Sequence, residues 1–273
     1  MLKQAIDLPG VGNARELGGY AVQDKHVREG VLLRTAALTR ATPEALERLR
    51  VTYKLQTIVD LRMTIERDRQ PDPQVSGATN RPLTIIEMED YPVPEGLDPS
   101  ALDLLNDPSA NRMELFELSY EFGMVGPNMY EQFLLGERGK AGYAEFFREL
   151  LALEDGRAIL WHCTDGKDRT GCAAMLLLFA LGASRQTVLE DYLLTNEYNA
   201  SLIEAAVGHF AAHPMPPEKL EVLKIMVGAV AESYMAHVID VLEERYGSVE
   251  GYVRDALGVS EAELGLLRDK FLV

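Results

Sequence analysis

The residues from Trp161 to Gly171, WHCTDGKDRTG, bring a cysteine, a glycine and an arginine together in one short segment. A thiol is a poor nucleophile until it ionises, and a helix N-terminus with a nearby guanidinium lowers the pKa of a cysteine from about 8.5 to about 3.5–7.5. The chain between Cys163 and Arg169 can wrap into a semicircle whose backbone N–H groups converge on an anion. The planar guanidinium of Arg169 can then clamp two phosphoryl oxygens. This spacing predicts a thiolate placed beneath a bound phosphate, ready for in-line attack on phosphorus.

The same segment resembles the signature of the cysteine-dependent protein tyrosine phosphatases: His-Cys, five residues, Arg, then Ser or Thr. His162, Cys163, Arg169 and Thr170 match it without a gap. The GKDRTG run resembles an atypical bacterial branch that acts on phosphotyrosine and, in some members, on phosphoserine, phosphothreonine or phosphoinositides. Further similarity to this branch lies at residues 13–20 (NARELGGY), 30–35, 60–66, 191–196 (DYLLTN) and 246–248 (YGS).

This resemblance implies a role for each matched residue. Cys163 is expected to form a cysteinyl-phosphate, and Arg169 to bind the phosphate and stabilise the transferred group. Thr170 corresponds to the hydroxyl that stabilises the thiolate as a leaving group, and His162 is expected to orient the loop by hydrogen bonding. The remaining residues of the expected phosphate-binding loop are Thr164, Asp165, Gly166 and Lys167. No metal ion or cofactor is expected.

The general acid has three candidates. The better-known tyrosine phosphatases take it from a Trp-Pro-Asp loop, which this sequence lacks, since its single Trp is Trp161. The bacterial branch carries an acid inside the loop, which corresponds to Asp168. Asp60, at the end of a predicted strand, is the second candidate, and an acid from residues 87–121 is the third. Asp165 stands where a small or apolar residue is common, and its charge would repel inositol phosphates, which favours phosphopeptides.

A buried strand and a buried helix are expected to hold the loop. Residues 158–162 are apolar on both faces, as a central parallel strand requires. Residues 171–181 are apolar almost all round and end at Gly182, which is typical of a buried helix with a glycine cap. A second strand is predicted at 57–61, after a helix that starts at Thr42-Pro43-Glu44. The alternation predicts an α/β fold, and the family resemblance implies a mostly parallel sheet of four or five strands flanked by helices.

The segment 87–121 differs in character from the rest of the chain. It carries one base, four prolines and ten acids: Glu87, Glu89, Asp90, Glu95, Asp98, Asp103, Asp107, Glu114, Glu117 and Glu121. We expect a lid-like insertion at about 87–135 within a single domain of residues 1–273, an acidic surface without a role being the alternative. Residues 184–273 are expected to form a helical C-terminal part. There, an apolar stripe from Leu220 to Leu242, interrupted at Gly228, predicts core packing.

Composition excludes several classes of protein. The 273 residues include 27 Lys and Arg against 43 Asp and Glu, a net charge of −16, which argues against nucleic-acid binding and against adsorption to anionic membranes. The longest uncharged apolar stretch, between Arg169 and Arg185, has 15 residues and is too short to cross a bilayer. The N-terminus lacks a signal-peptide pattern, so a cytoplasmic location is expected, with export by another route left open. The sequence does not indicate an oligomeric state.

Three residues outside the signature have simpler interpretations. Cys172, the second of two cysteines, is expected to be a packed thiol, a redox partnership with Cys163 being the alternative. His209 and His213 lie four residues apart but lack the Glu of a zinc-hydrolase helix, and beside Pro214 they indicate a helix end.

The sequence predicts a metal-independent phosphomonoester hydrolase. It would act on protein phosphotyrosine, with phosphoserine and phosphothreonine as further substrates. One alternative keeps the chemistry and changes the substrate to a phosphoinositide or a small phosphometabolite. Others are a degenerate phosphatase that only binds phosphate, and a sulfurtransferase with a rhodanese-like loop. The intact set of Cys163, Asp168, Arg169 and Thr170 argues against the degenerate module, and the residues around the cysteine favour phosphate over sulfur.

Overall fold

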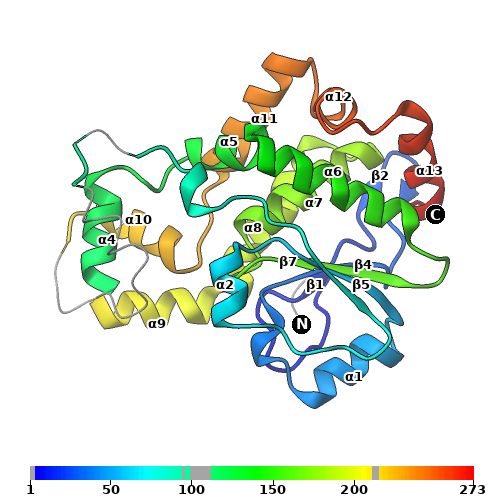
Figure 1. Cartoon of the computed structure of the whole chain (residues 1–273), viewed down its shortest axis with the longest axis horizontal. Helices are drawn as coiled ribbons and strands as arrows, with labels where there is room; N and C mark the ends of the chain where they lie inside the picture. The colour runs from blue at the N-terminus through cyan, green and yellow to red at the C-terminus, as the bar shows by residue number, and fades with distance from the viewer. Residues whose placement is uncertain (1–3, 94–95, 99–111, 211–214) are drawn as a thin grey trace.

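A five-stranded sheet crosses the middle of the computed structural model, which describes residues 4–93, 96–98, 112–210 and 215–273 (Figure 1). The strand order is β1 (Arg15–Glu16), β4 (Leu32–Thr35), β7 (Ala158–His162), β5 (Leu55–Asp60) and β6 (Thr79–Pro82). All neighbouring strands are parallel except β1, which pairs antiparallel with β4 at one edge. Strands β2 (Ala21–Val22) and β3 (Lys25–His26) form a separate hairpin. The predicted α/β fold with a mostly parallel sheet is confirmed.

The strand register brings three strand ends together. His162, the last residue of the central strand β7, pairs with Thr35 on β4 and with Asp60 on β5. In open parallel sheets, ligands bind at the carboxyl ends of the strands. The chain therefore leaves β7 for Cys163 at the edge of the sheet where a ligand site is expected.

Alternate residues of β7 face two cores, which is why every residue of this strand is buried. Ile159 and Trp161 face the larger core, and Ala158 and Leu160 face a smaller one with α1 (Pro43–Val51). Figure 1 shows α1 below the sheet and most other helices above it. The helices of the larger core are α5 (Asn128–Leu135), α6 (Glu137–Ala152), α7 (Asp168–Leu181), α8 (Arg185–Tyr198), α11 (Glu232–Tyr246), α12 (Val249–Asp255) and α13 (Glu261–Phe271).

Local signals place the two predicted helix ends correctly. Helix α1 begins at Pro43, and the Thr42 side chain accepts a hydrogen bond of 3.2 Å from the backbone N–H of Ala45. Helix α7 ends at Gly182, whose φ of +95° is the left-handed conformation that glycine adopts without strain. Three shorter helices are α2 (Thr64–Arg69), η1 (Leu38–Arg40) and η2 (Met88–Asp90).

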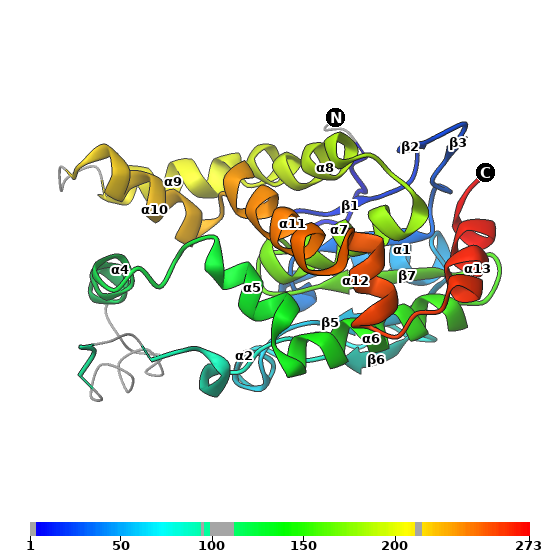
Figure 2. The same ribbon diagram turned by 90° about the horizontal axis from the view of Figure 1, so that it is seen from above.

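Three helices extend away from the sheet to one side, as Figures 1 and 2 show: α4 (Arg112–Glu121), α9 (Ala200–Phe210) and α10 (Pro217–Val227). We call this group the arm. Its α4 and α10 are linked through Lys219, which pairs with Glu117 and lies 5.5 Å from the ring centre of Phe116 and 5.3 Å from that of Tyr120.

The apolar stripe of the C-terminal part divides at Gly228, as predicted. Helices α10 and α11 meet there at a bend of 75°. Val238 and Leu242 on α11 lie in the main core, whereas on α10 only Leu223 is buried. Within the described residues, no single helix is long and apolar enough to cross a membrane, and only this bent pair reaches the necessary length and composition.

The two ends of the predicted 87–135 insertion differ. Near its start, Glu89 and Asp90 form ion pairs with Arg138 on α6. Near its end, α5 contributes Tyr130 and two further buried side chains to the main core. Glu95, Asp103, Asp107 and, beyond the insertion, His213 lie outside the described residues. A lid therefore stays a prediction, and it applies only to the residues of the insertion that precede α5, because α5 belongs to the main core.

Candidate active site

Cys163 lies directly after β7, and the loop from it to Lys167 leads into α7. The cysteine is 2 % exposed. The first turn of α7 is tied to the core, because Trp161 Nε1 donates to the Thr170 carbonyl (3.2 Å) and the Tyr143 hydroxyl donates to the Arg169 carbonyl (3.1 Å). The loop is thus fixed at both of its ends.

The loop has the shape of an anion cradle. The Cys163 carbonyl lies 3.0 Å from His162 Nδ1, and the Thr164 carbonyl accepts a 3.0 Å bond from the backbone N–H of Ala37. In a trans peptide the next N–H points the opposite way from the carbonyl, so carbonyls bound on the outside leave N–H groups facing inward. Gly166 has φ of +67°, and a Cβ there would overlap the backbone of Thr35, so only glycine fits.

The guanidinium of Arg169 is held by Glu66, on α2. Nη1 lies 2.6 Å from Oε2 and Nη2 lies 3.0 Å from Oε1, and the Thr164 hydroxyl donates to the same carboxylate. Burial raises the pKa of Glu66, but the bonds from Arg169 outweigh it and hold the pKa at about 2. A guanidinium has five N–H donors, so Arg169 can bind this carboxylate and a phosphate together. In the sequence, Glu66 belongs to the 60–66 resemblance, and no role was expected for it.

Asp168, the first residue of α7, accepts a hydrogen bond of 2.6 Å from the Tyr130 hydroxyl. That hydroxyl also lies 2.6 Å from the hydroxyl of Tyr192, on α8. Burial raises the pKa of Tyr130 well above 10, and the charge of Asp168 adds to the effect, so this tyrosine stays a donor. Both tyrosines lie far from the signature in the sequence, and neither was expected to have a role, although Tyr192 belongs to the 191–196 resemblance.

The side chain of Lys167 turns away from the cradle. Its ammonium donates to the Ile225 carbonyl at the end of α10 and lies 3.5 Å from the Ala229 carbonyl, as well as 3.6 Å from Asp168 Oδ2. Lys167 therefore ties the loop to the turn between α10 and α11. Asp165, two residues earlier, is the other charged loop residue, and burial raises the pKa of its carboxyl.

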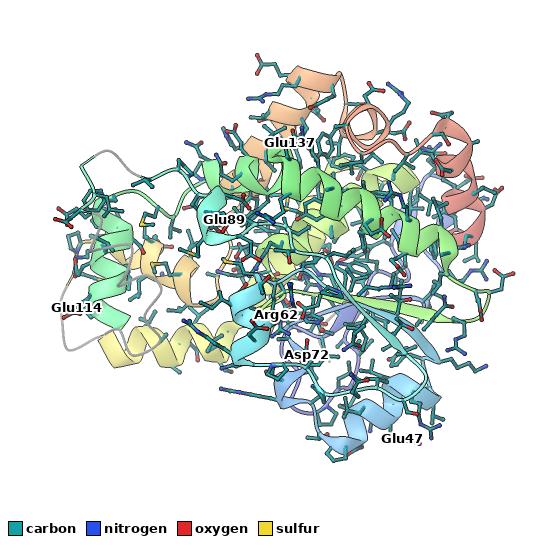
Figure 3. All side chains as sticks on the ribbon, in the orientation of Figure 1. Glu47, Arg62, Asp72, Glu89, Glu114 and Glu137 are labelled. Atoms are coloured by element: carbon teal, nitrogen blue, oxygen red, sulfur yellow. The ribbon has the colours of Figure 1, made fainter. Side chains whose placement is uncertain are left out.

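Asp60 is bound to Arg62 through both carboxylate oxygens. Arg62 Nε lies 2.9 Å from Oδ1 and Nη2 lies 2.7 Å from Oδ2. Burial raises the pKa of Asp60, but the bonds to Arg62 and the charge of His162 outweigh it and lower the pKa overall. Arg62 also contacts Asp72 at 2.6 Å, and Figure 3 shows these two residues close together.

Asp60, Asp72 and His162 offer ligand atoms within 4.8 Å of one another, a spacing that could hold a metal ion. The guanidinium of Arg62 already supplies a cation to both carboxylates. His162 Nε2 lies 3.1 Å from Asp72; burial lowers the pKa of His162, but the two carboxylates raise it above its usual value overall. The cluster is thus a support directly before the cysteine, in which Arg62 pairs with both carboxylates.

Helix α7 carries two further buried groups, the Cys172 thiol and the Thr170 hydroxyl. Cys172 is fully buried, and burial raises the pKa of its thiol well above the usual value, as expected of a packed cysteine. The Thr170 hydroxyl is buried without a hydrogen-bond partner among the described residues. An unpaired hydroxyl beside the loop is free to donate to a thiolate, the role that the family resemblance implies.

A cysteine beneath inward-facing N–H groups, with an arginine at a helix start, is the arrangement of a cysteine-dependent phosphatase. The model of the tyrosine phosphatase family matches residues 6–273, so the chain belongs to this family.

Individual relatives agree with this assignment. A Cupriavidus necator protein, provisionally named a tyrosine-protein phosphatase, is 32 % identical over 93 % of this chain and 84 % of its own length. The triple specificity protein phosphatase PtpB of Mycobacterium tuberculosis is 28 % identical over 97 % of this chain and 98 % of its own length. A tyrosine-protein phosphatase of Nostoc commune is 30 % identical over 46 % of this chain.

Proposed function

We propose that this phosphatase hydrolyses phosphotyrosine in proteins, and also phosphoserine and phosphothreonine, without a metal ion. The observation that carries the proposal is the cradle, in which carbonyls are bound outside and a cysteine and Arg169 lie at its two ends. The triple specificity in the name of the Mycobacterium tuberculosis relative supports the wider substrate range. Phosphoinositides and small phosphometabolites are the alternative substrates.

In the proposed reaction, the Cys163 thiolate attacks phosphorus in line with the ester oxygen. An S–P bond forms as the P–O bond breaks, and the leaving oxygen takes a proton from a general acid. Arg169 and the loop N–H groups stabilise the charge on the transferred phosphoryl group. Water then attacks phosphorus and returns a proton to the general acid, while the S–P bond breaks and the thiolate leaves with the Thr170 hydroxyl as a hydrogen-bond donor.

We assign the general acid to Asp168. Its side chain is 19 % exposed, which leaves it accessible to a substrate, whereas the Asp60 side chain is 9 % exposed and bound to Arg62. Asp168→Asn should reduce kcat much more for phenyl phosphate than for p-nitrophenyl phosphate, because only the poorer leaving group needs the proton. Asp60→Asn should reduce both rates equally. The reverse pattern would transfer the role to Asp60.

The deciding test is phosphate release from phosphotyrosine and phosphoserine/threonine peptides and from phosphoinositides, with EDTA present. Release that survives EDTA, is inhibited by vanadate and disappears in Cys163→Ser would support the mechanism. The same panel ranks the substrates. Release from no substrate by folded, reduced protein would favour the phosphate-binding module, and thiocyanate formed from thiosulfate and cyanide would favour a sulfurtransferase.

A further inference from the structure

Two segments that resemble the family but have no role in the mechanism above, residues 13–20 and 191–196, meet beneath the loop. Asp191 on α8 lies between two arginines: Arg15 Nε is 3.1 Å from its Oδ1, and Arg34 Nη1 contacts its Oδ2. Both arginines are fully buried, and Asp191 is 1 % exposed. Charged side chains are almost never buried this completely unless they are paired.

Asn13, which contacts Arg15, and Arg34 bind the outside of the loop directly, and we call Asn13, Arg15, Arg34 and Asp191 the buried arginine cluster. Asn13 Nδ2 donates to the carbonyls of Asp165 (3.2 Å) and Gly166 (2.9 Å). Arg34 Nη2 donates to the same Gly166 carbonyl at 2.9 Å. These bonds join residues more than 130 positions apart in the chain, so they exist only in the folded protein.

These bonds determine which way the loop N–H groups point. Because carbonyl and following N–H point in opposite directions, binding the Asp165 carbonyl outside aims the N–H of Gly166 inward. Binding the Gly166 carbonyl in the same way aims the N–H of Lys167 inward. Asn13 and Arg34 thus complete the series that His162 and Ala37 begin at the carbonyls of Cys163 and Thr164.

The cluster also carries a surplus positive charge. Two guanidinium groups face one carboxylate, while Arg169 is paired with Glu66. Burial raises the pKa of Asp191, but its two arginine partners outweigh this and lower it, so the carboxylate is charged. Burial and the neighbouring Arg15 lower the pKa of Arg34 to about 10, which still leaves it charged at neutral pH. Positive charge behind the loop favours an anion in front of it.

We propose that Asn13 and Arg34 are positioning residues of the phosphatase reaction: they hold the Asp165 and Gly166 carbonyls outside the loop, so that two N–H groups face the phosphate. The Arg15–Asp191 pair holds them in turn, since Arg15 also contacts Asn13 Oδ1 and Asp191 contacts Arg34. This inference rests on the proposed function, because it concerns the same phosphate site. Neither residue touches the substrate.

The test compares two isosteric changes within the same buried cluster. Asn13→Asp replaces the amide that binds the loop with an acceptor and keeps an oxygen toward Arg15. Thr195→Val removes a hydroxyl that accepts a 3.2 Å bond from Arg15 and does not contact the loop. Each variant is measured for thermal stability, for kcat and KM with p-nitrophenyl phosphate, and, in a Cys163→Ser background, for tungstate affinity by calorimetry.

Asn13→Asp should lower kcat/KM on the order of 100-fold and tungstate affinity about tenfold or more, because misplaced oxyanion donors have effects of this size. Thr195→Val should keep both within about threefold. The losses of kcat/KM and of tungstate affinity in Arg34→Lys should lie between those of the other two variants. An ammonium can reach the Gly166 carbonyl or Asp191 but does not span both as a guanidinium does.

Three results would overturn the proposal. One is a stable Asn13→Asp protein that binds tungstate like the parent. Another is a loss of affinity in Thr195→Val equal to that in Asn13→Asp. If Asn13→Asp does not fold, Arg34→Lys decides, and parental tungstate affinity in that variant contradicts the proposal. An unaltered protein that binds tungstate but releases no p-nitrophenol would refute the proposed function alone, because the titration still measures the loop.

Discussion

The phosphate loop and the arm are held in place by different kinds of contact. The loop is bound on its outer side by buried donors, whereas within the arm α10 is joined to α4 through Lys219, whose partner Glu117 is 50 % exposed. Breaking a buried polar contact leaves an unpaired group and is costly, whereas an exposed ion pair contributes about 0–1 kcal/mol. The comparison predicts that the loop, which carries the chemistry, tolerates substitution less well than the arm.

The largest effect is expected at the nucleophile. Cys163→Ser should lower kcat by at least about 10⁴-fold, because loss of a nucleophile has effects of this order. The cradle and Arg169 remain, so tungstate should still bind with an affinity within about tenfold of the parent. Stopped-assay phosphate release and calorimetry measure the two quantities. Turnover that persists in a protein purified free of other phosphatases would contradict the role of Cys163.

The second effect concerns Glu66. Glu66→Gln should lower kcat/KM about 10- to 100-fold, because Arg169 loses the charged partner that orients it. Asp68→Asn, an exposed acid on the same helix, is the matched control and should change little. A fall in KM with a rise in kcat/KM would instead mean that Glu66 competes with phosphate for Arg169.

The same substitution has a signature in acid. Since the pKa of Glu66 is lowered to about 2 in the folded protein, its charged form stabilises the fold above about pH 4.5. This contribution, at most about 3 kcal/mol, is lost as the pH falls toward 2. The melting temperature should therefore fall less steeply between pH 5 and pH 2.5 in Glu66→Gln than in the parent. Parallel curves would contradict the ion pair with Arg169.

Local patterns predicted much of the rigid part. The β-branched and apolar runs gave β5 and β7, and Thr42 and Gly182 marked helix ends, because these signals act within a few residues of the chain. The signature likewise located the loop between β7 and α7.

What the sequence did not reveal is which distant groups support the loop. Asn13, Arg34 and Glu66 reach the loop from three separate segments: the chain before β1, strand β4 and helix α2. Only the folded sheet, in which β4 pairs with β7, brings such distant segments to the loop. For Lys167, a residue type that indicates one role has a different set of contacts in the structure. A lysine in a phosphate loop indicates an anion ligand, yet here its ammonium is bound to carbonyls at the end of α10, which spacing alone cannot show.

A smaller effect is expected behind the general acid. Tyr130→Phe removes the donor to Asp168 and should lower kcat about tenfold, with a larger loss for phenyl phosphate than for p-nitrophenyl phosphate. Tyr192→Phe, which removes only the more distant hydroxyl, should lower kcat about threefold or less. Equal losses in the two variants, or equal losses with both substrates, would mean that the tyrosines support the fold rather than the acid.

The smallest effect is expected in the arm. Lys219→Ala removes the ion pair to Glu117 and the contacts with two aromatic rings, and should cost no more than about 1–2 kcal/mol of stability. Lys224→Ala is the matched control, because it breaks only an exposed pair with Glu221 on the same helix. Both variants should hydrolyse p-nitrophenyl phosphate at the parental rate.

If the arm contributes to recognition, Lys219→Ala alone should change KM for a phosphotyrosine protein, by about two- to fivefold. A large loss of kcat with the small substrate would show instead that the arm supports the loop, through the bond of Lys167 to the end of α10, and that the two regions are one unit.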